Sequence, residues 1–390
     1  MMADDTAPAT GMASAADPRP VDHDEAIQVL QVARRIGYAS VLWGDVGIGK
    51  STLVERFGRE LGVPVITVIA SQSDPTDFGG MPVQSVASVV SADGVDHEVP
   101  TVDYALPDWA AQAFAAGEAI ILLDEFTNAS PSVQAAALEV ILNRKVGRVR
   151  LPDAVQFIAA ANPPEIAANG FELSPPTANR FMHLHLAVPS ATAWTDALVD
   201  GWGLGPLPDH ERTAAAAVAA FIRSRPNLLH DRPNTAGAAG LAWPSPRTWA
   251  QVVKGLAVVG VEASSQAQLV VESLVGPFAS REFLHWLTHI DLPDPAHALA
   301  NPSSVEFSPQ RPDRAYAILL SIVLHAKEIV GDRPAVWTEA MSFLAHAADT
   351  VPDIAAHAAR TLPSRPEGAE LPANITNFLE VLAAAGFTQG

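Results

Sequence analysis

The run from Gly44 to Ser51, GDVGIGKS, places three glycines, a lysine and a serine in the order G-x-x-x-x-G-K-S. Glycine lets the backbone turn tightly and brings its N–H groups close to phosphate oxygens, which a Cβ would obstruct. In such a loop Lys50 supplies a positive charge to the β and γ phosphates, and the Ser51 hydroxyl holds Mg²⁺. The spacing therefore predicts a phosphate-binding loop for a nucleotide with its magnesium ion.

The segments on either side of this loop have the pattern that it needs. Residues 38–43 are apolar enough for a buried strand, and residues 51–61 have the pattern of a helix whose N-terminus faces the anion. Strand, loop and helix in this order argue against a mere tight turn. We expect the nucleotide to contact the loop and the residue after it, namely Gly44, Asp45, Val46, Gly47, Ile48, Gly49, Lys50, Ser51 and Thr52.

An acidic pair supplies the second part of the chemistry. Residues 119–123, AIILL, predict a strand buried on both faces of a parallel sheet, and Asp124 and Glu125 follow it. Ligands of such sheets bind at the carboxyl ends of the strands. We expect Asp124 to orient the Mg²⁺ shell and Glu125 to polarise the water that attacks the γ-phosphate. A solvated acidic pair that caps a strand is the alternative, which the neighbouring phosphate loop disfavours.

Three further polar residues stand where they can act on the same phosphates. Asn162 ends a predicted strand, residues 155–161, where its amide can hold a water near the γ-phosphate, although a turn-forming Asn before proline is the alternative. Arg180 stands between a short predicted helix and a strand, and its guanidinium can neutralise charge that develops in the transition state. Arg247 follows Ser-Pro in the first turn of a predicted helix. Each arginine, taken alone, also fits an ordinary helix-end position.

The elements that must position these residues fall into an α/β half and a helical half. Strand-like and helix-like segments alternate up to residue 188, which predicts a parallel sheet covered on both faces. After Pro189 only helical patterns follow, and we expect separate helices at 263–277 and about 280–290. The predicted parts are a flexible tail (1–20), an α/β core (21–188) with an inserted β-hairpin (about 83–102), a helical segment (189–278) and a C-terminal helical extension (279–390).

Composition excludes several classes of protein. The chain has 390 residues and a formal charge of −19, which argues against a broad grip on nucleic acid, although a local basic pore is not excluded by it. It has no cysteine, so disulfides and thiolate metal sites are absent. The richest apolar run, residues 214–222, is too short to cross a bilayer, and no charged-then-apolar leader opens the chain. We therefore expect an acidic cytoplasmic protein without a membrane span.

In this order, the motifs GDVGIGKS, ILLDEF, AAANPP, LSPPTANRF and SPRTW resemble those of the AAA+ ATPases of the MoxR type, which include the related NorQ and CbbQ activators. The stretch SQSDPTDFGG resembles the Asp-Pro-Thr-Asp loop of that group, and the predicted hairpin stands where the group inserts one into a helix. The resemblance covers about residues 25–275. It implies a P-loop NTPase core of the AAA+ type, and residues 189–278 would be its helical lid.

The resemblance also implies ATP as the nucleotide and a role for each polar residue above. It makes Lys50 and Ser51 the Walker A residues, Asp124 and Glu125 Walker B, Asn162 sensor 1, Arg180 the arginine finger for a neighbouring subunit, and Arg247 sensor 2 in the lid.

The partners that the resemblance implies are other copies of the chain and a client. Members of the group assemble as rings, most often sixfold, and often act with a protein that carries a von Willebrand factor A domain. Activation of another enzyme or insertion of its metal is the usual outcome. A P-loop kinase or phosphotransferase is one alternative, which the set Asn162, Arg180 and Arg247 disfavours. A DNA-associated switch is another, which the charge of −19 disfavours.

Two clusters of polar residues have weaker interpretations. His183 and His185 alternate along a predicted strand without a third ligand, so we interpret them as ordinary strand residues and not as a metal pair. Arg144, Lys145, Arg148 and Arg150 form a basic run, which we interpret first as a solvated face.

Overall fold

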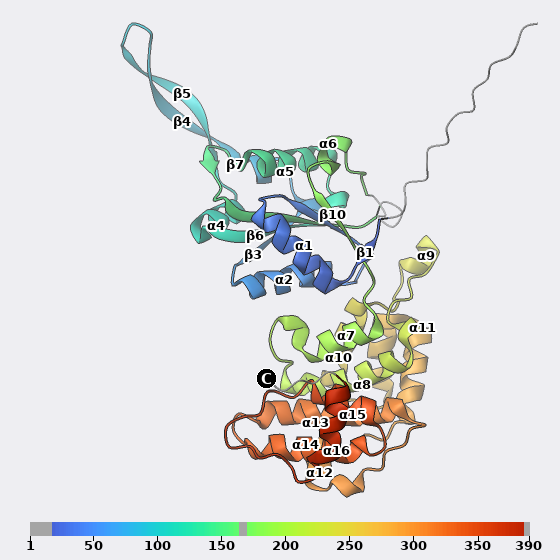
Figure 1. The fold of residues 1–390 in the computed structure, drawn as a ribbon. Helices are drawn as coiled ribbons and strands as arrows, with labels where there is room; N and C mark the ends of the chain where they lie inside the picture. The colour runs from blue at the N-terminus through green and yellow to red at the C-terminus, as the bar shows by residue number, and fades with distance from the viewer. Residues whose placement is uncertain (1–17, 164–169, 386–390) are drawn as a thin grey trace, which may run out of the picture.

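The computed structural model describes residues 18–163 and 170–385. An α/β core comes first along the chain, and two groups of helices follow it, one beyond the other (Figure 1). Most of the predicted tail, residues 1–17, lies outside the described residues.

A six-stranded parallel sheet forms the centre of the core, in the order β1-β10-β2-β9-β6-β3. Its strands are β1 (Pro20–Val21), β2 (Ser40–Trp43), β3 (Val65–Ile69), β6 (Glu118–Asp124), β9 (Ala154–Ala161) and β10 (Met182–Leu186). The predicted parallel sheet of a P-loop NTPase is confirmed. The end of the predicted tail is wrong, because Pro20 pairs with His185 and adds an edge strand to the sheet.

Helices cover both faces of this sheet. They are α1 (His23–Arg35), α2 (Lys50–Leu61), α3 (Thr76–Gly79), α4 (Asp108–Ala116), α5 (Pro131–Asn143) and α6 (Pro175–Ala178). Side chains alternate across a strand, so Leu122 packs with α1 and α2 while its neighbour Leu123 packs with α4 and α5. Both leucines are almost completely buried, which explains the continuous apolar run of β6.

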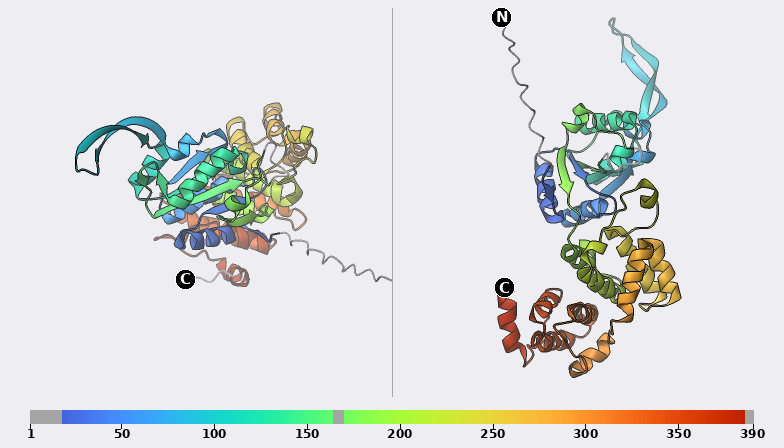
Figure 2. Two further views of the ribbon diagram at one scale, coloured as in Figure 1. Left: turned by 90° about the horizontal axis from the view of Figure 1, so that it is seen from above. Right: turned by 90° about the vertical axis from the view of Figure 1, so that its right-hand side faces the viewer.

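Two antiparallel hairpins interrupt the α/β pattern. The strands β4 (Met81–Val90) and β5 (Asp96–Ala105) pair along their whole length, and the hairpin extends away from the body of the core (Figures 1 and 2). It is longer at both ends than the expected 83–102. The strands β7 (Lys145–Val146) and β8 (Val149–Arg150) form a second, short hairpin from the basic run.

The helical half begins with α7 (Ala191–Val199), α8 (Arg212–Ser224), α9 (Ala236–Ala239), α10 (Pro246–Val259) and α11 (Ser265–Thr288). The C-terminal helices are α12 (Pro295–Ala300), α13 (Pro312–Ile329), α14 (Ala335–Ala348), α15 (Pro352–Ala359) and α16 (Ile375–Ala384). Short 3₁₀ turns occur at Ala70–Gln72, Phe126–Asn128, Gly201–Gly203, Asp209–Glu211, Pro226–Leu228 and Pro302–Ser304.

The break expected near residue 278 lies inside α11. Gly276 has a φ of 79° and a ψ of 168°, which is not a helical conformation, so two helices meet there at a kink just before Pro277. The expected boundary between lid and extension falls just after this kink. The helix α13 joins the two hydrophobic clusters of this half, because Leu320 packs with the first and Leu319 with the second. None of the helices that the structure describes is long and apolar enough to cross a membrane.

Candidate nucleotide-binding site

Three neighbouring strands deliver the predicted site residues to one edge of the sheet. β2 leads into Gly44, β6 ends at Asp124, and β9 is followed by Asn162. Because β2, β9 and β6 are adjacent and parallel, their carboxyl ends lie side by side. This edge is where ligands of open parallel sheets bind.

The phosphate loop has the backbone conformation that its glycines allow. Gly47 and Gly49 have φ angles of 77° and 98°, which side chains other than glycine rarely adopt. Gly49 caps α2 without a side-chain hydrogen bond. The first N–H groups of that helix can therefore donate to an anion. The loop thus has the shape and the donors that a phosphate needs.

Lys50 links the loop to Asn162. Its Nζ donates to the Asn162 Oδ1 at 2.8 Å and to the carbonyl oxygens of Gly44 and Asp45 at 2.9 Å each. Burial lowers the pKa of Lys50 to about 8, while the charges of Asp124 and Asp45 act to raise it. An ammonium group held among oxygens at this edge is well placed to exchange some of them for phosphate.

Ser51 and Asp124 provide the oxygen ligands expected for magnesium. The Ser51 Oγ donates to Asp124 Oδ2 at 2.9 Å. A hydroxyl and a carboxylate beside a phosphate loop fit Mg²⁺, which takes few protein ligands and keeps water and phosphate oxygens. Among the described residues no group of three or more His, Asp or Glu side chains could hold a metal. His183 instead accepts a hydrogen bond from the Trp43 indole at 2.9 Å.

Glu125 lies next to Asp124 in an unusual backbone conformation. Its φ is 54° and its ψ is 36°, a left-handed conformation that is rare for glutamate. The Glu125 N–H donates to Asp124 Oδ1, and its carboxylate accepts from the hydroxyl of Ser71. Ser71 follows β3, the strand beside β6, and our sequence analysis missed it. The sheet order would have been needed to find it.

The helical segment contacts the phosphate loop directly. The Arg247 N–H donates to the carbonyl of Gly47 at 3.0 Å, and a Cβ on Gly47 would lie 2.9 Å from the Ser245 Oγ. Ser245 caps α10 and holds Arg247 in the first turn, as predicted. The charge of Arg247 also lowers the pKa of Lys50, so the two cations lie near each other.

A second contact from the helical segment was not predicted. The Asp45 Oδ2 lies 3.1 Å from the Arg232 Nε and 3.5 Å from the His230 Nε2. Both partners lie between α8 and α9, far from Asp45 along the chain. No local sequence pattern connects them.

Arg180 lies at the opposite edge of the sheet. It is exposed and stands two residues before Met182, the first residue of β10, which pairs with Ser40 at the amino end of β2. The phosphate loop begins four residues beyond Ser40, a distance of about 13 Å along a strand. The nearby Tyr38 hydroxyl donates to the Asn179 carbonyl at 2.9 Å. The fold therefore does not bring Arg180 to the phosphate loop of its own chain.

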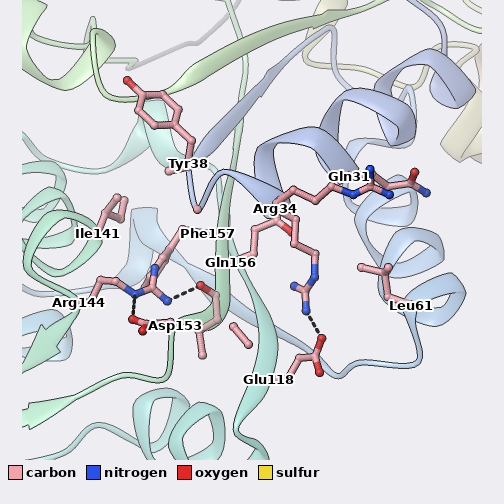
Figure 3. Close-up of a pocket in the computed structure, with 15 residues that line it drawn as sticks. Gln31, Arg34, Tyr38, Leu61, Glu118, Ile141, Arg144, Asp153, Gln156 and Phe157 are labelled. Atoms are coloured by element: carbon pink, nitrogen blue, oxygen red, sulfur yellow. Dashed lines mark hydrogen bonds and ion pairs between the residues drawn. The ribbon is translucent and has the colours of Figure 1, made fainter.

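A cavity of about 540 Å³ also lies at this amino edge (Figure 3). Arg34 pairs with Glu118 on one side of it, and Arg144 donates to the carbonyls of Pro152 and Val155 on the other. Arg144 therefore has a structural role in the basic run, and the cavity is separate from the nucleotide site.

Comparison with known families matches residues 39–181 to the model of the AAA domain (dynein-related subfamily). A search of the curated proteins finds no match. Solved structures give distant likenesses, among them the RuvB Holliday junction branch migration motor of Thermotoga maritima, at 14% identity over 71% of this chain and 74% of that one, with a TM-score of 0.34. NtrX from Brucella abortus in complex with ATP is 14% identical over 81% and 64% of the two chains, with a TM-score of 0.35.

The matched span agrees with the geometry of the site. It contains the phosphate loop, the acidic pair at the end of β6, and Asn162 after β9. It also ends just after Arg180. Residues 39–181 therefore form an AAA domain with the P-loop NTPase fold.

Proposed function

We propose that this chain is an AAA+ ATPase of the MoxR type, which hydrolyses ATP in a ring to remodel or activate a partner protein in the cytoplasm. The observation that carries the ATPase part is the joining of Lys50 to Asn162 and of Ser51 to Asp124 at one sheet edge. These pairs come from different segments of the chain. Their convergence supports a site built for the phosphates of a nucleotide.

Each residue would have a distinct role during hydrolysis. Lys50 neutralises the β and γ phosphates, and Ser51 and Asp124 hold Mg²⁺, which supplies further positive charge there. Glu125 polarises the attacking water, and Asn162 helps to orient it. Phosphoryl transfer depends on such positioning and charge more than on covalent chemistry. One chain thus contains every side chain proposed for the reaction except the arginine that a neighbouring subunit would supply.

The ring is proposed from the place of Arg180. An exposed guanidinium at the amino edge is well placed to meet the nucleotide of another subunit. An interface that joins the amino edge of one copy to the carboxyl edge of the next uses two different surfaces, and such an interface forms a ring when the rotation between copies closes. We expect six subunits, as the resemblance to the MoxR group implies.

The long hairpin is the surface that we propose for the partner. Its exposed apolar side chains are Met81, Val83, Val86, Val89, Val90, Val95, Val102 and Tyr104. Residues 81–105 carry four acidic residues and no lysine or arginine. An isolated two-stranded ribbon is marginally stable in water, so a partner with apolar and basic groups would stabilise it. A client enzyme or a protein with a von Willebrand factor A domain is the partner that we propose.

The test is steady-state ATP turnover per subunit over a wide range of protein concentration, with Mg²⁺ and without partner. A rate that rises and then saturates, as the particle grows from monomer to ring, is expected if sites are completed between subunits. A constant rate from a particle that stays monomeric would contradict the ring. Absence of turnover from a fully assembled ring with Mg²⁺ would contradict the ATPase.

A further inference from the structure

The side chain of Asp45, in the phosphate loop, makes contacts in two directions. Its Oδ1 accepts the N–H of Val46 at 2.7 Å, a contact within the loop. Its Oδ2 lies 3.1 Å from Arg232 Nε, a contact with the helical segment. The first contact fixes the carboxylate, so that the second oxygen is aimed at the arginine.

The Arg232 side of this pair is also fixed by its surroundings. The neighbouring Asp231 N–H donates to the Pro244 carbonyl at 3.0 Å, which closes the loop before α10. His230 is largely buried, and its ring packs at 83° to the Trp243 ring. The Trp249 indole donates to the Leu228 carbonyl at 2.6 Å and ties the start of this loop to α10. Arg232 therefore projects from a braced loop.

The Asp45–Arg232 pair is partly shielded from water, which strengthens the attraction between its two charges. The Asp45 side chain is 21% exposed and the Arg232 side chain 36%. The Asp45 carbonyl oxygen accepts from the Lys50 ammonium at 2.9 Å. A displacement of Asp45 would thus move an oxygen that holds Lys50 in place. The helical segment is connected through Arg232 to the group that faces the phosphates.

We propose that Arg232 is a positioning residue that holds the lid on the phosphate loop through Asp45 and so sets how fast the nucleotide leaves. The inference rests on the proposed function, because it assumes that the phosphate loop binds ADP and ATP. Together with the bond from Arg247 N–H to the Gly47 carbonyl, the pair gives the lid two points of attachment on one loop. Breaking one of them lets the lid open more often and frees the product sooner.

The experiment measures the release of a fluorescent ADP analogue from the full chain by stopped flow. The variants are Arg232→Gln, Asp45→Asn and the double variant, and Arg232→Lys tests whether charge alone restores slow release. We expect release to become about tenfold faster in each single variant, the change that a charged hydrogen bond of ordinary strength produces. The double variant should be no faster than either single variant, because both remove the same contact. Association should change little.

Arg225→Gln is the matched control, since Arg225 is an exposed arginine of the same segment that donates to the neighbouring Ser224 carbonyl. Release from it should equal that of the wild-type chain. Additive effects of the two single variants, or release that is unchanged in both, would overturn the proposal. A wild-type chain that binds no ADP analogue would overturn the proposed function itself, which the same titration reveals before any variant is compared.

Discussion

The two edges of the central sheet differ in how their polar groups are used. At the carboxyl edge four residues are half-buried and form two hydrogen-bonded pairs, Lys50 with Asn162 and Ser51 with Asp124. At the amino edge Arg180 is exposed and lies about 13 Å or more from that cluster, judged by the length of β2. The same domain therefore carries a site on one edge and an exposed guanidinium on the other. The proposed assembly of copies would use both.

The largest effect on ATP turnover is expected from removal of Arg180 at the amino edge. Arg180→Ala should leave ATP binding intact and reduce turnover by about 10³ or more, because the guanidinium neutralises charge that develops only in the transition state. Turnover and nucleotide affinity are measured on the same assembled sample. Arg281→Ala, which removes an exposed arginine from α11, is the control and should be near wild type. Near-normal turnover of Arg180→Ala would remove the residue from the reaction.

Removal of one carboxylate at the other edge should have the next largest effect. Glu125→Gln keeps the shape of the side chain but cannot polarise water as strongly, so turnover should fall by about 10²–10³ while ATP still binds. Glu139→Gln on α5 is the matched control, because this glutamate is exposed and takes no part in the hydrogen bonds of the cluster at the carboxyl edge. Equal turnover in both variants would mean that the attacking water is activated elsewhere.

Gly47 tests whether the lid must approach the carboxyl edge closely. Gly47→Ala introduces backbone strain and also a Cβ 2.9 Å from the Ser245 Oγ, so ADP affinity should fall by about tenfold. Gly62→Ala is the control, because Gly62 has a similar φ of 71° with no atom within 4 Å of its added Cβ. Binding isotherms for ADP should separate the two. The same loss in both variants would assign the effect to strain alone.

The smallest effect is expected far from either edge, where Asp196 joins the lid to the C-terminal helices. Burial acts to raise the pKa of Asp196, but bonds to His357 and Arg223 outweigh it and hold the pKa below its usual value. Such a group stabilises the fold above its unfolded pKa, and this contribution is lost as pH falls through the folded pKa. Its side chain is 45% exposed, so Asp196→Asn should cost only about 1 kcal/mol at neutral pH.

Urea unfolding of the wild-type chain and of Asp196→Asn checks this. The difference in unfolding free energy should begin to shrink below about pH 4, where the carboxyl of the unfolded chain takes up a proton, and should vanish once the pH falls below the lowered folded pKa. A difference that stays constant down to acid pH would show that the charge is not what stabilises this contact.

The parts of the site that the sequence predicts are those encoded by short motifs. A loop such as GDVGIGKS and an apolar strand ending in Asp-Glu determine their local backbone and side-chain directions with little help from the rest of the chain. Given a parallel sheet, the meeting of Lys50 with Asn162 follows, because neighbouring strands end at one edge. Whether these residues act as expected stays a prediction.

What the sequence does not predict depends on contacts between distant segments. The pairing of Asp45 with Arg232, and of Glu125 with Ser71, requires the sheet order and the course of the chain between α8 and α9. The helix break expected near residue 278 is, by contrast, encoded locally. Gly276 and Pro277 interrupt the helical backbone of α11, and the absence of a Cβ on Gly276 also lets the Ala242 carbonyl approach closely.

The central claim is that the two edges of neighbouring subunits form one site, and mixing two inactive variants tests it most directly. Glu125→Gln retains Arg180, and Arg180→Ala retains the carboxyl edge, so a mixed ring joins an intact guanidinium to an intact acidic pair at some interfaces. In an equal mixture about a quarter of the sites should be complete by chance, and ATP turnover should recover toward that share of the wild-type rate. Turnover that stays at the level of the separate variants, in rings shown to contain both chains, would contradict the account.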